Sequence, residues 1–151
     1  MGIFHSINTS ASALTAQRLR MDAASSNIAN ADSTRATQNV NGDWEPYRRK
    51  MVELQPKEQT FQSLLQTAAN QSESPGTGVK ATKITEDQEP FKEVYNPNHP
   101  DADQNGYVQL PNVDPLQEMV DMMSATRSYE ANVTSINATK SMLMKALEIG
   151  R

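Results

Sequence analysis

The sequence has 151 residues, a net charge of −4 and no cysteine, which fits one domain and excludes disulfides and thiol chemistry. Leu, Ile, Val and Phe account for only 26 residues, below the roughly 20% of a chain that usually supports an independent core. Nucleic-acid binding needs clustered cations, and the only basic run is Arg48-Arg49-Lys50. No apolar run is long enough for membrane insertion or for a signal-peptide core. We therefore expect a marginally stable monomer whose helices are buried against partners.

The first predicted element is an Ala-rich amphipathic helix that extends to about Asn30. Short polar side chains around that position compete for backbone hydrogen bonds and end the helix. Apolar residues recur along it every seven positions, and this spacing keeps one seam of a helix facing a partner helix. The stripe consists of Ile7, Leu14, Met21 and Ile28.

The middle of the chain predicts a small β-rich module with a thin core. Residues 31–43 form a polar connector that closes with the turn signal Asn41-Gly42. Short runs bounded by Pro, Gly, Asn or Asp are typical of antiparallel strands. The four candidate strands are Tyr47 to Leu54, Val79 to Thr85, Phe91 to Tyr95 and Tyr107 to Leu110. Residues 61–69 have the apolar spacing of a short helix. We interpret Arg48-Arg49-Lys50 as the solvated edge of the first strand.

The C-terminal region predicts one long helix from Pro115 to Ile149. Asp114 is a favourable N-cap, and proline at the first helical position loses no hydrogen bond there. The next 34 residues contain neither Pro nor Gly, and Gly150 ends the helix. Its apolar stripe comprises Met122, Tyr129, Ile136 and Leu143, interleaved with Met119, Val133 and Leu147 and interrupted by Thr126 and Lys140. An uninterrupted two-stranded coiled coil would not contain those two breaks, so the helix is expected to meet several different neighbours.

The best candidate for a ligand site is the loop at residues 101–106, Asp-Ala-Asp-Gln-Asn-Gly, which matches the opening of an EF-hand loop. Position twelve of that loop would be Asn112, where a bidentate Glu is needed. The preceding segment, Asn96 to Pro100, cannot be a helix because it contains two prolines. We therefore favour a turn, and keep a calcium-binding interaction module using this loop as the alternative function.

Other catalytic and cofactor motifs do not stand out. The only histidines, His5 and His99, lie far apart in the sequence without other metal-ligating residues around them. The sequence contains no Ser-centred elbow, P-loop or dinucleotide fingerprint. We predict no catalytic residues, no cofactor and no metal, and expect that the protein is not an enzyme.

A series of motifs in a fixed order resembles the bacterial flagellar rod and hook protein family. Near the N-terminus these are Ser12 to Leu14, Leu19 to Asp22 and Ser25 to Thr34, and in the middle Asn98 to Asp103, Gly106 to Val108 and Pro111 to Val113. The C-terminal motifs are Glu118 to Met123, Arg127 to Val133 and Lys145 to Arg151. Residues 46–50 narrow the resemblance to members of the proximal rod. The sequence departs from the family at Arg35 to Glu45 and at Glu58 to Thr77.

The resemblance implies a mainly α fold in which the N- and C-terminal helices pair as an antiparallel coiled coil around a β-rich insertion. Residues 1–34 and 112–151 would form the axial coiled-coil domain, and residues 35–111 the connector and a small β-containing outer domain. The two apolar stripes would be the assembly interface, both within a subunit and between subunits.

The implied function is that of a structural subunit that polymerises through its terminal helices into the torque-transmitting rod of the flagellar basal body. Such a protein leaves the cytoplasm through the flagellar type III export apparatus, without a cleaved signal peptide, and lies in the periplasmic region. The implied neighbours are other proximal-rod proteins and the rod base at the MS-ring junction.

Overall fold

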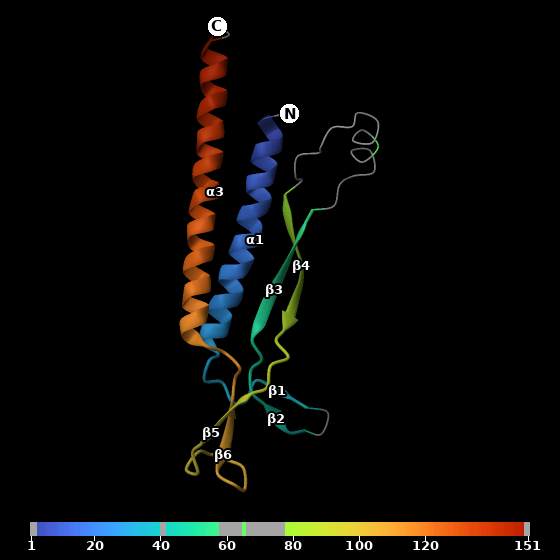
Figure 1. Ribbon diagram of the computed structural model, residues 1–151, viewed down its shortest axis with the longest axis vertical. Helices are drawn as coiled ribbons and strands as arrows, with labels where there is room; N and C mark the ends of the chain where they lie inside the picture. The colour runs from blue at the N-terminus through green and yellow to red at the C-terminus, as the bar shows by residue number, and fades with distance from the viewer. Residues whose placement is uncertain (1–2, 40–41, 58–64, 66–77, 150–151) are drawn as a thin grey trace. The chain divides into compact units, whose positions relative to one another are not determined.

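A computed structural model describes residues 3–39, 42–57, 65 and 78–149 (Figure 1). Among these residues, two long helices, α1 and α3, stand at the ends of the sequence with six short strands between them. Their bounds are α1 Ile3–Ala29, β1 Thr37–Gln38, β2 Trp44–Glu45, β3 Lys50–Pro56, β4 Val79–Glu86, β5 Lys92–Tyr95, β6 Tyr107–Leu110 and α3 Pro115–Ile149. Except for Leu65, the short helix expected at residues 61–69 lies outside the described residues, as do Asn41 of the predicted turn and Gly150.

The start of α3 and the end of α1 follow from the residues at those positions. At the start of α3 the backbone N–H of Leu116 donates to the Asp114 carboxylate at 3.0 Å, and that of Glu118 donates to the Asp114 carbonyl at 3.0 Å. Asp114 is therefore the predicted N-cap, with Pro115 as the first helical residue. At the end of α1 the Asn30 side chain donates to the Ser26 carbonyl at 2.9 Å, which satisfies a terminal backbone acceptor.

The strands form three separate two-stranded sheets, β1 with β2, β3 with β4, and β5 with β6. The β5–β6 pair is antiparallel, with Lys92 opposite Leu110 and Tyr95 opposite Tyr107. Arg49 just before β3 accepts a backbone bond from Asp87 just after β4, and Lys57 after β3 donates to Gly78 before β4. This pair is therefore antiparallel too. The sequence predicted strands close to β3, β4, β5 and β6.

The connector expected at residues 31–43 instead contains a strand, since antiparallel β1 pairs Thr37 with Glu45 and Gln38 with Trp44 of β2. Gly42 lies between these strands at a φ of 87°, a left-handed conformation that glycine adopts without steric cost. Its N–H donates to the Asn39 carbonyl at 2.9 Å. Two-residue strands are too short to show a periodic pattern, so periodicity does not predict this hairpin.

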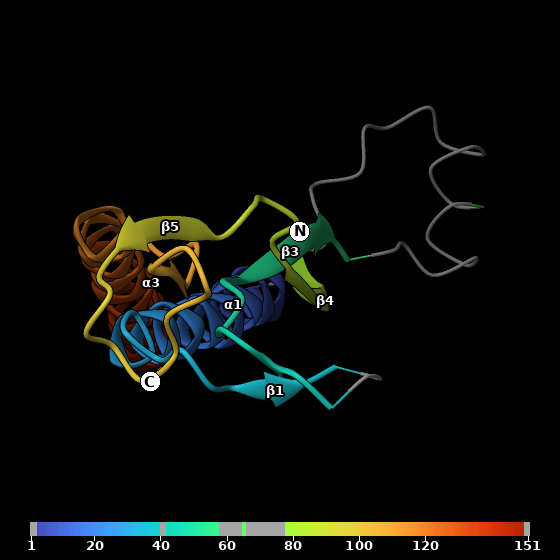
Figure 2. The same ribbon diagram turned by 90° about the horizontal axis from the view of Figure 1, so that it is seen from below.

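The chain divides into two compact units. Unit 1 comprises residues 1–19, 53–83 and 125–151, and unit 2 comprises residues 20–52 and 84–124. Within each unit, segments of α1 and α3 lie side by side and run in opposite directions (Figures 1 and 2). The predicted pairing of the terminal helices, with small β-sheets between them in the sequence, is confirmed. Their pairing as a coiled coil stays a prediction.

The buried core is small and consists mainly of small side chains. Ala16 and Ala125 of unit 1 are 2% and 0% exposed, and Ala24 of unit 2 is 4% exposed. In unit 2, Tyr47, Val108 and Val113 are also buried. Among the described residues no Leu, Ile, Met or Phe is fully buried. This thin core agrees with the low content of large aliphatic residues.

Candidate functional site

In unit 2, side chains from α1, from α3 and from the segments before β3, after β4 and before α3 meet in a cluster that we call the polar junction. Its members are Asn27, Tyr47, Arg49, Asp87, Asn112, Glu118 and Asp121. They are joined by hydrogen bonds and ion pairs, and several of them are fully buried.

Asn27, on the last full turn of α1, is 1% exposed and forms hydrogen bonds with both ends of its side-chain amide. Its Nδ2 donates to the Lys50 carbonyl and to Glu118 Oε2, both at 2.9 Å. Its Oδ1 accepts from the Lys50 N–H at 2.9 Å and from the Tyr47 hydroxyl at 3.0 Å. Four bonds saturate an asparagine side chain, so this buried polar group carries no unmet hydrogen-bonding capacity.

Glu118, in the first turn of α3, is 2% exposed and forms the anionic centre of the junction. Its Oε1 accepts from Arg49 Nε at 2.5 Å, while its Oε2 accepts from Asn27. The N-terminal turn of a helix also favours a negative charge. A buried carboxylate is stable only when it is paired and hydrogen-bonded, and both conditions are met.

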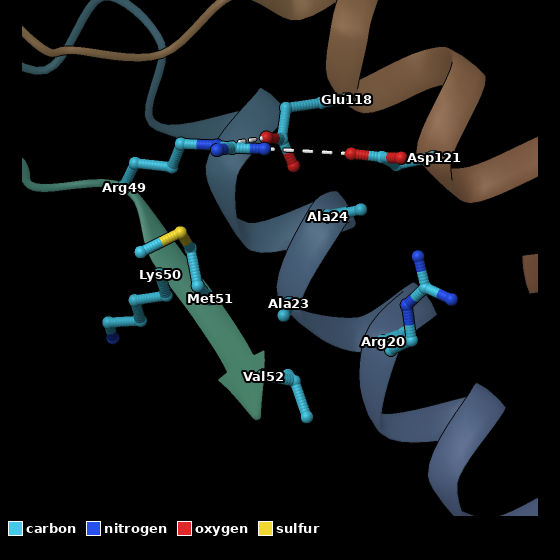
Figure 3. Close-up of a pocket in the computed structure, with 9 residues that line it drawn as sticks. All are labelled: Arg20, Ala23, Ala24, Arg49, Lys50, Met51, Val52, Glu118 and Asp121. Atoms are coloured by element: carbon cyan, nitrogen blue, oxygen red, sulfur yellow. Dashed lines mark hydrogen bonds and ion pairs between the residues drawn. The ribbon is translucent and has the colours of Figure 1, made fainter. Parts of the chain in front are cut away.

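Arg49 is surrounded by three carboxylates, because its guanidinium also lies 3.5 Å from Asp87 and 3.5 Å from Asp121. Figure 3 shows the contacts with Glu118 and Asp121. Burial by itself would lower the pKa of Arg49, but the hydrogen bonds and charges of Glu118 and Asp87 outweigh it and raise that pKa. Arg49 therefore remains a cation that holds β3 to α3.

Asn112 attaches the segment before α3 to the same junction. Its Oδ1 accepts from the backbone N–H of Arg49 at 2.9 Å, and its Nδ2 donates to the carbonyls of Asp87 and Glu89 at 3.4 and 3.3 Å. The expected solvated edge at Arg48-Arg49-Lys50 is thus wrong for Arg49, whose side chain is 24% exposed. The Arg48 guanidinium lies 4.4 Å from the centroid of the Phe91 ring.

A hollow of about 170 Å³ lies beside the junction, and Figure 3 shows the side chains around it. It is lined by Arg20, Ala23, Ala24, Arg49, Lys50, Met51, Val52, Glu118 and Asp121. The lining oxygens of Glu118 are bound to Arg49 and Asn27 rather than directed at an open space. The site therefore holds segments of the chain together through hydrogen bonds and ion pairs.

The loop at residues 101–106, considered above for calcium, is a turn whose first carboxylate is already bound. Asp101 accepts from Arg35, with Nε at 2.6 Å, and from the Thr34 hydroxyl at 2.8 Å. Hydrogen bonds from Arg35 and then Thr34 lower the pKa of Asp101. Gly106 takes a φ of 81° in the turn before β6. Over residues 3–39, 42–57, 65 and 78–149, no three His, Asp or Glu side chains group as metal ligands would.

The predicted assembly residues occupy two kinds of position. Those that the structure leaves half-buried are Ile7, Leu14, Met21 and Ile28 of α1 and Met122, Tyr129, Val133, Ile136 and Leu143 of α3. Met119 and Leu147 are exposed, at 45% and 72%. No helix within the described ranges has the length and apolar character that crossing a membrane requires.

Comparison with known proteins places these features in a family. Residues 7–37 match the family model of flagella basal body rod proteins, and residues 104–149 match the C-terminal model of flagellar basal body rod FlgEFG proteins. Over its full length the chain is 65% identical to the flagellar basal-body rod protein FlgC of Bacillus subtilis, all of which it covers. It is 44% identical to the FlgC protein of Borreliella burgdorferi, with 99% of this chain and 98% of that protein covered. It is 42% identical to the FlgC protein of Salmonella typhimurium, with both chains fully covered. The chain therefore belongs to the FlgC family of flagellar basal-body rod proteins and is a structural subunit of the flagellar rod.

Proposed function

We propose that this chain takes its place in the proximal rod by polymerising through α1 and α3, whose stripes form coiled-coil contacts within and between subunits. The observation that supports this most directly is the incomplete burial of the stripes in a single chain. Leu14 and Leu143 are only half-buried, whereas Leu147 is 72% exposed. Fully burying one large apolar side chain contributes about 1.5–3 kcal/mol, so neighbouring subunits can supply much of the stability that one chain lacks.

The same proposal divides the chain by role. Residues 1–34 and 112–151 form the axial domain, and residues 35–111 form the connector and outer domain. The polar junction serves this arrangement because it ties the first turn of α3 to the last turn of α1 and to β3. Such cross-links would help a rod subunit to resist torque. Breaking a buried hydrogen bond leaves a donor and an acceptor without a partner, and each then costs its desolvation free energy.

Membership of the rod family also supports the remaining parts of the proposal. The protein acts without catalysis, in the part of the basal body that crosses the periplasm. It reaches that position through the flagellar type III export apparatus without a cleaved signal peptide. Its neighbours are the other proximal-rod proteins and the rod base at the MS-ring junction.

Paired substitutions in the two stripes test the coiled-coil contacts. Leu14→Asp together with Leu143→Asp places charge in both seams, and we expect loss of rod assembly and motility in a strain that lacks the native gene. Thr15→Asp with Ala146→Asp is the matched control, because both of these neighbouring residues are exposed. Circular dichroism of the purified chains checks that both variants still fold. Normal motility of the stripe variant at native protein levels would contradict the proposal.

A further inference from the structure

The two compact units carry charges of opposite sign. Unit 2 contains thirteen Asp and Glu against six Lys and Arg, which gives a net charge of −7. Unit 1 contains eight Lys and Arg against five Asp and Glu, a net charge of +3, and the two values make up the −4 of the whole chain. Because like charges repel, a contact between unit 1 of one copy and unit 2 of the next is favoured over contacts between identical units.

The basic surface of unit 1 includes an exposed edge of the β3–β4 hairpin. Lys80 and Lys83 both lie on β4, which among the described strands pairs only with β3. They are three residues apart and so lie on opposite faces of the strand, and both side chains are exposed. Within the part of the chain that the structure describes, neither lysine forms an ion pair. We call these two residues the basic edge. Their ammonium groups are available to a partner.

The acidic surface of unit 2 includes a hollow of about 440 Å³ that we call the aromatic groove. Trp44 and Tyr107, 54% and 47% exposed, supply its aromatic side chains. Three carboxylates line it, those of Asp43, Asp101 and Asp103. Asp101 forms an ion pair with Arg35, whereas Asp43 and Asp103 form no ion pair in the described residues.

The chemistry of the groove matches that of the basic edge. An ammonium group is attracted by the faces of Trp and Tyr rings and by unpaired carboxylates, and the aromatic groove offers both. We propose that the basic edge of one copy docks into the aromatic groove of a second copy, so that subunits associate head to tail. Two different surfaces in one contact give a heterologous interface, which repeats along a helical polymer instead of closing into a dimer. The inference rests on the proposed function as a polymerising subunit, but it requires neither apolar stripe.

Trp44 gives a direct readout, because it is the only tryptophan in the sequence. Raising the concentration of the purified full-length chain at low salt should shift Trp44 emission to the blue, as a second copy excludes water from the ring. About 0.5 M NaCl should weaken the association about tenfold, because exposed charge pairs are screened. An emission spectrum that is independent of concentration and of salt would overturn the proposal.

Charge reversal identifies the two surfaces. Lys80→Glu with Lys83→Glu makes both surfaces of a chain negative, whereas Asp43→Lys with Asp103→Lys makes both positive. Neither variant should show the emission shift alone. An equimolar mixture should recover it, because the negative surfaces of one variant then face the positive surfaces of the other. The control is Glu89→Lys with Glu93→Lys, which changes the charge of unit 2 equally at exposed residues outside the groove and should preserve the shift.

The outcomes separate this inference from the proposed function. A mixture that fails to associate although both variants retain native circular dichroism would overturn the head-to-tail contact. A control that loses the shift as fully as the groove variant would also overturn it, since net charge alone would then explain the association. If the stripe variant Leu14→Asp with Leu143→Asp assembles normally while the emission shift persists, the coiled-coil proposal fails and this contact stands.

Discussion

At the scale of single residues, the side chain of Asn27 forms the hydrogen bonds that a neighbouring strand would otherwise form with Lys50 of β3. Its side-chain amide exchanges an N–H and a C=O bond with the backbone of Lys50, as an antiparallel strand partner would. The same side chain reaches Glu118 of α3. One amide therefore fixes the register between α1 and β3 and also the position of the first turn of α3.

Removing Arg49 should be strongly destabilising. Arg49→Ala leaves the carboxylate of Glu118 buried without its cation, which costs about 3 kcal/mol when one partner of a buried pair is lost. Adding Glu118→Gln should restore part of this loss, since the uncompensated charge is gone. Urea unfolding measures both variants, with Arg18→Ala at an exposed position of α1 as a control expected within about 0.5 kcal/mol of native. Equal stability of Arg49→Ala and the control would show that the junction contributes little.

The contact between Arg35 and Asp101 should fail in acid. The pKa of Asp101 is lowered by Arg35 and Thr34, so the contact contributes stability above the unfolded carboxyl pKa, near about 3.9. That contribution is lost as the pH falls through the lower native pKa. Urea midpoints at pH 5 and below pH 4 should therefore diverge more for the native chain than for Asp101→Asn. Identical pH dependence of the two proteins would contradict this expectation.

At the scale of elements, Gly78 fixes the β3–β4 hairpin to α1 within unit 1. The N–H of Val79 donates to Ser12 Oγ at 3.1 Å, and Ser12 Oγ donates to the Thr9 carbonyl at 2.7 Å. Gly78 has a φ of 96°, and a Cβ at this position would lie 2.4 Å from Ser12 Oγ. A side chain at residue 78 would therefore displace Ser12 Oγ and disturb its hydrogen bond to the N–H of Val79.

Gly78→Ala should destabilise the chain more than Gly42→Ala. Both glycines have a positive φ, which costs an L-residue about 1–2 kcal/mol, but a Cβ on Gly42 meets no atom within 4 Å. The excess cost of Gly78→Ala therefore measures the contact with Ser12. In a double-mutant cycle, Ser12→Ala should cost less in the Gly78→Ala background than in the native chain, because the hydrogen bond is already lost. Equal costs for the two glycine variants would refute the close approach.

The elements differ in how far sequence can predict them. The N-terminus of α3 follows from Asp114 and Pro115, whose effects are local, and both helices are long enough to show their periodicity. The polar junction depends instead on pairs separated by 69 and 91 positions, Arg49 with Glu118 and Asn27 with Glu118. The local sequence around Asn27 therefore predicts only the end of a helix. Glu118 lies in the first turn of α3, where a negative charge is favourable, but no local pattern shows that it is buried.

At the scale of the whole molecule, the low content of large aliphatic residues explains why stability depends on neighbours. The C-terminal turns of α3 show this most clearly, because Met142, Met144, Leu147 and Ile149 are 55–87% exposed. Capping at Asp114 stabilises the other end of the same helix. Stability along α3 is therefore expected to decrease from its first turn to its last.

Amide hydrogen exchange should detect that gradient. In the dilute free chain, amides of residues 142–149 should exchange fast, because few buried contacts protect these turns. In intact basal bodies the same amides should exchange slowly, as neighbouring subunits cover them. Amides that follow the Asp114 cap, in the turn that carries the polar junction, should be protected in both states and serve as an internal control. Slow exchange at residues 142–149 in a verified monomer would instead show a preformed bundle.

The sequence separation between Asn27 and Glu118 also determines when the polar junction can form during synthesis and folding. A chain is synthesised from its N-terminus, so Asn27 precedes by 91 residues the carboxylate that completes its hydrogen bonds. Closing so large a loop must precede any gain from the contact, which makes such non-local pairings slow to form. Until the first turn of α3 has been synthesised, Asn27 can bond Lys50 and Tyr47 but lacks its hydrogen bond to Glu118. The polar junction can therefore close only after the first turns of α3, which carry Glu118 and Asp121, have been synthesised.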